Sequence, residues 1–235
     1  MPKVLDGFVF YGVFLFSTTL HEAAHAWAAM RGGDRTAYEG GQVTLNPMPH
    51  IRREIIGMVV LPIVSVLLSG WPLGFASAPY NRSWAERYPK RAGWMALAGP
   101  GANFLLVLLA ALLINLGVLG GVFSAPEHIT FADVTTATAG AGSWWNSVGY
   151  LIGSVFALNL LLGLFNLLPV PPLDGSAALV LVMPDHMVRK YQDFIWSHPQ
   201  VTWIGIIIAW QVFDKLFDPV FTMAISHLYP GVSYS

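Results

Sequence analysis

The stretch "STTLHEAAHAWAAM", Ser17 to Met30, carries the residues His21, Glu22 and His25. On a helix, residues four apart lie one turn apart on the same face, so the two imidazoles can bind one metal ion. Glu22 projects near the same rim and can reach a water molecule beside that ion without being a ligand. The spacing predicts a metal site of the kind that binds zinc and activates water, and chance occurrence of the motif is the alternative.

The residues around this motif are those of a membrane span, which runs from about Gly7 to Met30. The whole chain of 235 residues is 55% hydrophobic and 11% charged, and its mean hydropathy is +0.57. An ordinary soluble domain has roughly 25% charged residues. The composition therefore predicts an all-α polytopic membrane protein that forms a single domain over residues 1–235, with a core over about 7–182.

Further apolar runs approach the roughly 20 residues that a helix needs to cross a bilayer core. They are found near Ile55 to Trp71, Gly93 to Val122, Trp144 to Leu168 and beyond Val201. We expect about four to six membrane segments. A C-terminal membrane region over about 200–228 is interrupted by charges and is either one irregular span or a span plus an interfacial helix.

Lys and Arg side chains orient these segments. They occur in loops 31–53 and 81–91 and after Asp174, whereas loop 123–143 has none. The positive-inside rule places the first three regions in the cytoplasm and the last outside, in a multi-pass protein of the cell membrane. Because Ile55 to Trp71 lies between two basic loops, we expect it to be a re-entrant element. The net charge of −1 gives no basic field for nucleic acid, so the expected surroundings are the lipid bilayer.

A third zinc ligand is needed, because catalytic zinc uses three protein ligands and an open position. The chain has no cysteine, and Asp174 in "NLLPVPPLDGSAAL" is the strongest candidate. The prolines before it end a helix and present the aspartate on unwound backbone. The predicted topology brings it to the membrane face of the histidines, toward the cytoplasm. An ordinary loop with a solvated aspartate is the alternative.

Other residues allow two interpretations each. The β-prone stretch "GGQVTLNP" predicts short strands after the first span, and Gln42 to Leu45 form either an edge strand for an unwound substrate or a surface turn. Asn103 either lines the cavity or packs helices. The remaining histidines lack partner spacing and fit loops or interfaces better than a metal site: His50, His128, His186, His198 and His227.

The motifs "HEAAH", "NLLPVPPLDG" and "LAGPGANF" together resemble the site-2 protease family of intramembrane zinc metalloproteases, in its small form without an inserted peptide-binding domain. The resemblance implies one zinc per chain, held by His21, His25 and Asp174. It also implies that Glu22 is the general base and that Asn166 stabilises the oxyanion.

The expected function is hydrolysis of peptide bonds in or near the transmembrane segments of membrane proteins. Zinc would activate water, and Glu22 would take the proton. The alternative is a membrane metal carrier or sensor that uses the same ligands without proteolysis. Glu22 favours the hydrolase, because a carrier does not need it.

Overall fold

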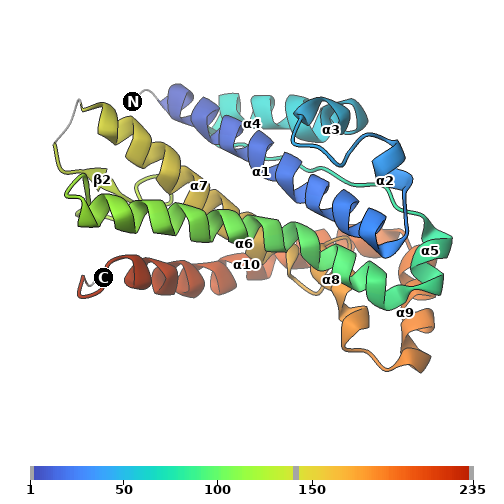
Figure 1. Ribbon diagram of the computed structural model, residues 1–235. Coiled ribbons are helices and arrows are strands. Elements are labelled where there is room, and N and C mark those ends of the chain that lie inside the picture. The colour runs from blue at the N-terminus through green and yellow to red at the C-terminus, as the bar shows by residue number, and fades with distance from the viewer. Residues whose placement is uncertain (1–2, 140–142, 233–235) are drawn as a thin grey trace.

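The computed structural model describes residues 3–139 and 143–232 and is mostly helical (Figure 1). Its α-helices are α1 (Lys3–Gly32), α2 (Thr36–Glu39), α3 (Pro47–Arg53), α4 (Leu61–Ser69), α5 (Arg82–Arg87), α6 (Pro89–Leu119), α7 (Trp144–Asn166), α8 (Asp174–Ala178), α9 (Asp185–Ser197) and α10 (Gln200–Leu228). A π-helical turn, Ile56–Val60, precedes α4, and a 3-10 turn, Leu179–Leu181, follows α8. Strands β1 (Phe123–Ser124) and β2 (Thr136–Ala137) pair antiparallel.

Helices α1, α6 and α7 pack against one another at the centre of the molecule, with α4 beside α1 and α10 along α6 and α7 (Figure 1). The largest apolar cluster joins Ile114 of α6, Phe156 of α7 and Ala209 of α10. Glycines and alanines let these helices approach closely, as the small residues of "LAGPGANF" predict. The three central helices thus form the frame that carries the site.

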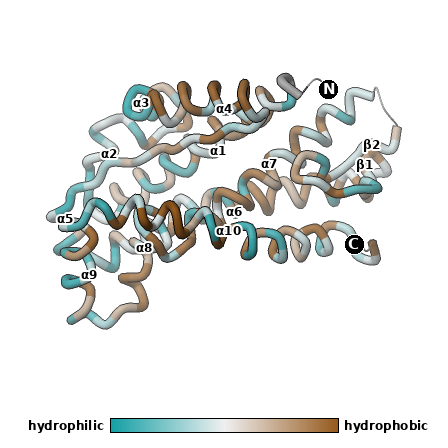
Figure 2. The backbone as a smooth tube through the Cα atoms, turned by 180° about the vertical axis from the view of Figure 1, so that it is seen from behind, coloured by the Kyte–Doolittle hydropathy of each residue, from teal (hydrophilic) through white to brown (hydrophobic). Residues whose placement is uncertain are grey.

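Two of the described helices, α6 and α7, are long and apolar enough to cross a membrane. Figure 2 shows how their hydrophobic positions continue along the tube. Helices α1 and α10 are as long, but polar side chains interrupt them, from Ser17 to Glu22 in one and from Asp214 to Asp218 in the other. The expected four to six membrane segments therefore stay a prediction.

The segment after α3 forms a short helix and then an extended return, so that its two ends lie at the same end of the molecule. The apolar helix from Ile56 to Ser69 spans only about 21 Å at 1.5 Å per residue, short of a bilayer core. Gly70 adopts a left-handed conformation (φ 76°) that ends the helix, and the chain returns extended. On the return, the Phe75 amide donates to the Gly57 carbonyl (3.1 Å) and Ser77 Oγ donates to Glu54 Oε1 (2.5 Å).

The strands expected after the first span do not form there. Residues 43–45 adopt bends, and the only described strand pair joins β1 to β2, far along the chain. Local polar contacts explain the difference: Thr44 Oγ1 accepts from the Asn46 amide (3.1 Å), and Asn46 Oδ1 caps α3 by accepting from Met48 (3.0 Å). Such contacts compete with strand pairing, so the surface-turn interpretation holds.

The chain unwinds between α7 and α8, as the prolines predict. Helix α7 ends at Asn166, and Asp174 opens α8. From α6, the Lys90 ammonium then clamps the end of this segment by donating to the carbonyls of Val180 (2.7 Å), Leu181 (3.4 Å) and Met183 (3.0 Å). Asp174 is therefore tied to the frame from its C-terminal side.

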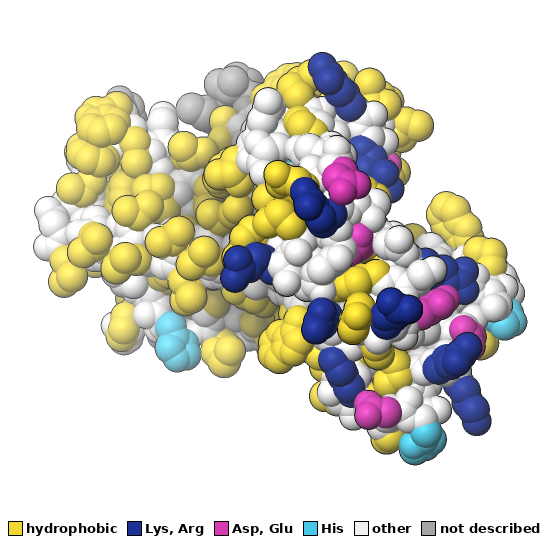
Figure 3. Space-filling view, turned by 45° about the vertical axis from the view of Figure 1, so that its right-hand side comes forward, with side chains coloured by type: hydrophobic (Ala, Val, Ile, Leu, Met, Phe, Trp, Pro, Cys, Tyr) yellow, Lys and Arg dark blue, Asp and Glu magenta, His cyan; other side chains and the backbone are white. Residues whose placement is uncertain are grey.

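Charged side chains gather at the end of the molecule where α1 stops and α6 starts. In the face shown in Figure 3, Lys and Arg crowd one side, and most of the coloured side chains on the other side are hydrophobic. Helices α3, α5 and α9 carry basic residues at this end, including Arg53, Arg87 and Arg189. The distribution agrees with the grouping of basic loops in the sequence.

The Lys90 clamp gives a testable consequence. Replacing Lys90 by Met leaves three carbonyls without their charged donor, and one such bond contributes about 1.5–3 kcal/mol. We therefore expect amide hydrogen exchange in residues 174–183 to rise by about tenfold or more. Mass spectrometry of exchange would measure it, with Lys190→Met, an exposed position in α9, as the matched control. Equal exchange in both variants would contradict the clamp.

Candidate metal centre

Helix α1 presents His21, Glu22 and His25 to the interior, where each is about 5–6% exposed. The helix is continuous through the motif. Just before it, the hydroxyls of Thr18 and Thr19 donate to backbone carbonyls one turn back, at 2.7 Å each. These local bonds satisfy the two hydroxyl groups, which would otherwise lack hydrogen-bond partners in apolar surroundings. A polar segment can therefore be buried within the bundle.

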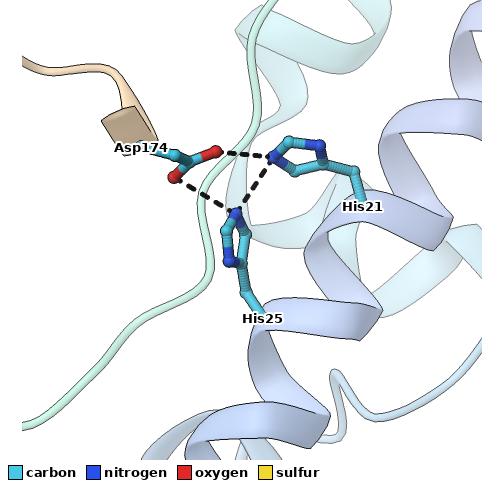
Figure 4. A group of neighbouring side chains, drawn as sticks. All are labelled: His21, His25 and Asp174. Atoms are coloured by element: carbon cyan, nitrogen blue, oxygen red, sulfur yellow. Dashed lines mark hydrogen bonds and ion pairs between the residues drawn. The ribbon is translucent and has the colours of Figure 1, made fainter. Parts of the chain in front are cut away.

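Asp174 meets both histidines although it lies about 150 residues further along the chain (Figure 4). Its Oδ2 is 3.1 Å from His21 Nε2, and its Oδ1 is 3.3 Å from His25 Nε2. The two Nε2 atoms are 3.0 Å apart. The predicted convergence of these three side chains is thus present in the fold.

The other nitrogen of each imidazole has its own partner. His21 Nδ1 lies 2.6 Å from Asn103 Oδ1, and His25 Nδ1 lies 2.8 Å from the Met95 carbonyl oxygen. Both partners are acceptors, so each Nδ1 carries a proton, and in the neutral ring each Nε2 offers a lone pair. Two lone pairs and a carboxylate facing one point repel each other unless a cation lies among them. The donor set fits a metal ion, and imidazole with carboxylate suits zinc.

A buried chain of hydrogen bonds extends from His21 across the three central helices. The Asn103 amide donates to Asn159 Oδ1 (2.8 Å), and the Asn159 amide donates to Ser17 Oγ (2.9 Å). Asn103, Asn159 and Ser17 are each 0% exposed. Sequence reasoning left the role of Asn103 open and missed Asn159. An amide inside an apolar helix was the available signal in both cases.

Gly99 of α6 brings backbone against the imidazoles. A Cβ built on Gly99 would collide with the Nε2 atoms of both His21 and His25. The space facing the two lone pairs therefore exists only because residue 99 has no side chain. Gly101, two residues on, faces open space and imposes no such condition.

The carboxyl group of Glu22 is buried, and one of its two oxygens lacks a hydrogen-bond partner in the part of the chain that the structure describes. Its Oε2 has no hydrogen-bond partner among the described residues. An unsatisfied carboxylate oxygen in such a place is costly, so it requires water or a ligand next to it. A group in this condition beside the histidines is suited to accept a proton.

The pKa of the Asp174 carboxyl lies well below its ordinary value. Burial acts to raise this pKa, but positive charge on the adjacent imidazoles of His25 and His21 outweighs burial. A metal ion in place of the imidazole protons would favour the carboxylate by the same attraction.

Asn166 is the predicted site residue with the least evidence from contacts. It is the last residue of α7, and its amide donates to the Leu162 carbonyl (2.9 Å) in the same helix. A primary amide has two N–H groups, so one donor is left after this bond. No described hydrogen bond joins Asn166 to the other site residues.

An apolar groove of about 290 Å³ lies beside α1, between Leu20, Ala23, Ala24 and Trp27 and the stretch Val43 to Leu45. These α1 residues recur at the spacing of a single helix face. His21, Glu22 and His25 project from other faces of α1. The groove is therefore separate from the ligand cluster.

Comparison with known proteins adds an independent observation. The sequence model for peptidase family M50 matches residues 9–206. The protein named "Putative zinc metalloprotease YwhC" of Bacillus subtilis (strain 168) is 29% identical over 240 residues, which cover 92% of this chain and 98% of that protein.

Two further relatives match only part of their own length. The proteins named "Putative zinc metalloprotease Rip2" of Mycolicibacterium smegmatis (strain ATCC 700084 / mc(2)155) and Mycobacterium tuberculosis (strain ATCC 25618 / H37Rv) are each 31% identical over 166 residues. That region covers 71% of this chain and 54% of each relative. No solved structure matches the chain.

The family match spans most of the chain and includes both motifs that supply the clustered side chains. His21, Glu22 and His25 lie near its start, and Asn166 and Asp174 lie toward its end. The chain belongs to peptidase family M50, the site-2 protease family.

Proposed function

We propose that this protein is an intramembrane zinc metalloendopeptidase that hydrolyses peptide bonds in or near the transmembrane segments of membrane proteins. The observation that carries the proposal is the convergence of His21, His25 and Asp174, with ligand atoms all within 4.8 Å of one another. Membership of a peptidase family supports the reaction class. The two apolar helices α6 and α7 beside the cluster support a substrate that lies in the bilayer.

One zinc ion per chain would be held by His21, His25 and Asp174. The approach of the Asp174 carboxyl to both Nε2 atoms and the space that Gly99 leaves open support this assignment. When bound, zinc supplies Lewis-acid chemistry that makes water acidic and polarises a carbonyl group. The hydrogen bonds that the imidazoles donate to Asn103 Oδ1 and to the Met95 carbonyl orient the rings for that ion.

Glu22 acts as the general base in this proposal. Its buried and unpartnered Oε2 would accept a proton from the attacking water and later return it to the leaving amine. Asn166 would donate its free N–H to the oxyanion that develops on the substrate carbonyl. A donor of this kind contributes typically about 2.7–4 kcal/mol to lowering the barrier.

A substrate helix hides its carbonyls in its own hydrogen bonds, so it must unwind locally before its peptide bond can be attacked. Every backbone group freed inside a bilayer needs a new partner. A polar site enclosed by α1, α6 and α7 would provide a place where water and an unwound peptide can coexist. This is the physical reason for placing a hydrolytic site among apolar helices.

The membrane arrangement is part of the proposal. We infer a multi-pass protein of the cell membrane whose basic end lies in the cytoplasm, with the site toward that side. The crowding of Lys and Arg at one end supports this orientation (Figure 3). The short helix α4 and its extended return support a re-entrant element, because Glu54 and Ser77 meet at the same end.

The role of Glu22 is tested by Glu22→Gln, which keeps the shape of the side chain but removes the base. We expect cleavage of a reconstituted transmembrane substrate to fall by at least about 100-fold, because general-base catalysis contributes that much or more. Zinc content, measured by mass spectrometry, should stay near that of the wild type. Unchanged cleavage with zinc retained would refute the protease mechanism and favour the carrier or sensor.

The proposed metal site can be tested by adding one methyl group at residue 99. Gly99→Ala places a carbon against both Nε2 atoms, so zinc affinity should fall by at least about tenfold, as for the ligand variant Asp174→Ala. Gly101→Ala, on the same helix and facing open space, is the matched control and should bind zinc normally. Normal zinc binding by Gly99→Ala would place the ion elsewhere.

The membrane arrangement is tested by single cysteines in this cysteine-free chain at Arg35, Arg87 and Thr136. An impermeant thiol reagent applied to oriented vesicles should label positions 35 and 87 from the cytoplasmic side and position 136 from the other. Each basic loop is held on the cytoplasmic side by its charge. Labelling of positions 35 and 87 from opposite sides would exclude the re-entrant element.

A further inference from the structure

Helix α10 has a buried stripe along which it packs on the rest of the chain. Its members recur every four residues: Gly205, Ala209, Phe213 and Phe217. Gly205 abuts the Pro171 carbonyl, and the ring of Phe213 lies 5.1 Å from that of Phe165 in an edge contact. At the far end, the Tyr229 hydroxyl donates to the Val134 carbonyl (3.0 Å). Helix α10 thus packs along α6 and α7 (Figure 1).

A second stripe lies on the opposite face of α10 and is exposed. Its six members, called here the outer seam, are Ile204, Ile208, Gln211, Lys215, Asp218 and Thr222. They are spaced alternately four and three residues apart, which is the spacing of a coiled-coil seam. No other described element of this chain covers them, since all six are exposed. One helix therefore carries an inward packing face and an unused seam.

The middle of the outer seam is charged. Asp214, next to the seam, Lys215 and Asp218 are all exposed, and no described hydrogen bond or ion pair involves them. Figure 2 shows hydrophilic positions in α10 between hydrophobic ones. Because α10 lies alongside α6 and α7, these charges lie at the depth of helices that are apolar enough to cross a bilayer. Unpaired charges facing lipid are costly and require partners.

We propose that the outer seam of α10 binds the same seam of a second copy of this chain, forming a two-fold symmetric dimer in the membrane. In a parallel pair each seam position faces its own copy, and the Lys215 side chain of each copy would enter the hole formed by Gln211, Asp214, Lys215 and Asp218 of the other, where it meets two carboxylates. Both signs are present on one face, so the surface is complementary to itself, as a two-fold interface requires. Polar side chains at seam positions also fix register and helix number.

A second copy fits better than lipid or a generic apolar segment. Lipid tails offer no counter-charge, and an apolar helix would leave all three charges unpaired. The flanking isoleucines supply apolar layers at one end, and Gln211 and Thr222 frame the charged centre. The proposal rests on the membrane arrangement proposed above, but not on zinc or on proteolysis.

The first test uses disulfide formation in this cysteine-free chain. Gln211→Cys and Thr222→Cys place a thiol on the seam, and Leu216→Cys, which is 50% exposed on another face of α10, is the matched control. After reconstitution at low protein density and mild oxidation, dimer yield at 211 and 222 should exceed that at 216 by about fivefold or more, because only seam positions face each other. Equal yields at all three positions, or no dimer at 211 and 222, would overturn the proposal.

The second test exchanges the charges. The triple variant Asp214→Lys, Lys215→Asp, Asp218→Lys keeps the complementarity within a pair of identical copies but opposes like charges in a mixed pair. With the seam cysteine present in differently tagged copies, each form should cross-link with itself, and mixed dimers should be depleted. Random mixing, or loss of self-association in a variant whose helical circular dichroism is intact, would contradict charge pairing between copies. Neither readout depends on cleavage, so failure here leaves the proposed function standing.

Discussion

Every polar group buried in this bundle needs a hydrogen-bond partner, and the chain from His21 through Asn103 and Asn159 to Ser17 is where that constraint acts most strongly. It starts on α1, crosses α6 and α7 and returns to α1. Removing one member would leave its neighbours unsatisfied, at a cost of about 1–3 kcal/mol per group. The relative positions of the three helices, and with them the orientation of one imidazole, are therefore set together.

Asp174 is positioned by an irregular segment of backbone, whereas the histidines are positioned by a long helix. The prolines before it prevent α7 from continuing, so the backbone turns back toward α1 and α6, and Lys90 holds the far end of the segment. A side chain that follows an irregular segment is normally less precisely placed than one within a long helix. Here the irregular segment is short, Asp174 begins α8, and Lys90 holds the segment that follows.

The sequence allowed much of this arrangement to be predicted, because the informative signals were local. The spacing of His21 and His25 and the prolines before Asp174 each act within a few residues, and their predicted meeting is present in the fold. The pairing of Asn103 with Asn159 could not be predicted, since it joins residues 56 positions apart across a helix interface. The short strands expected after the first span do not form, because capping bonds around Asn46 compete with weak strand propensity, and of the two interpretations of Gln42 to Leu45 the surface turn holds.

Gly99 also bears on which ions can enter the site. The backbone of α6 lies so close to both imidazoles that a Cβ at residue 99 would collide with them, and the bond from His21 to Asn103 joins this helix to α1. An ion such as calcium, which takes six to eight oxygen ligands at about 2.3–2.6 Å, would find too few oxygens here. In the proposed metal site the close backbone would also limit the coordination number, in addition to the selection that nitrogen ligands impose.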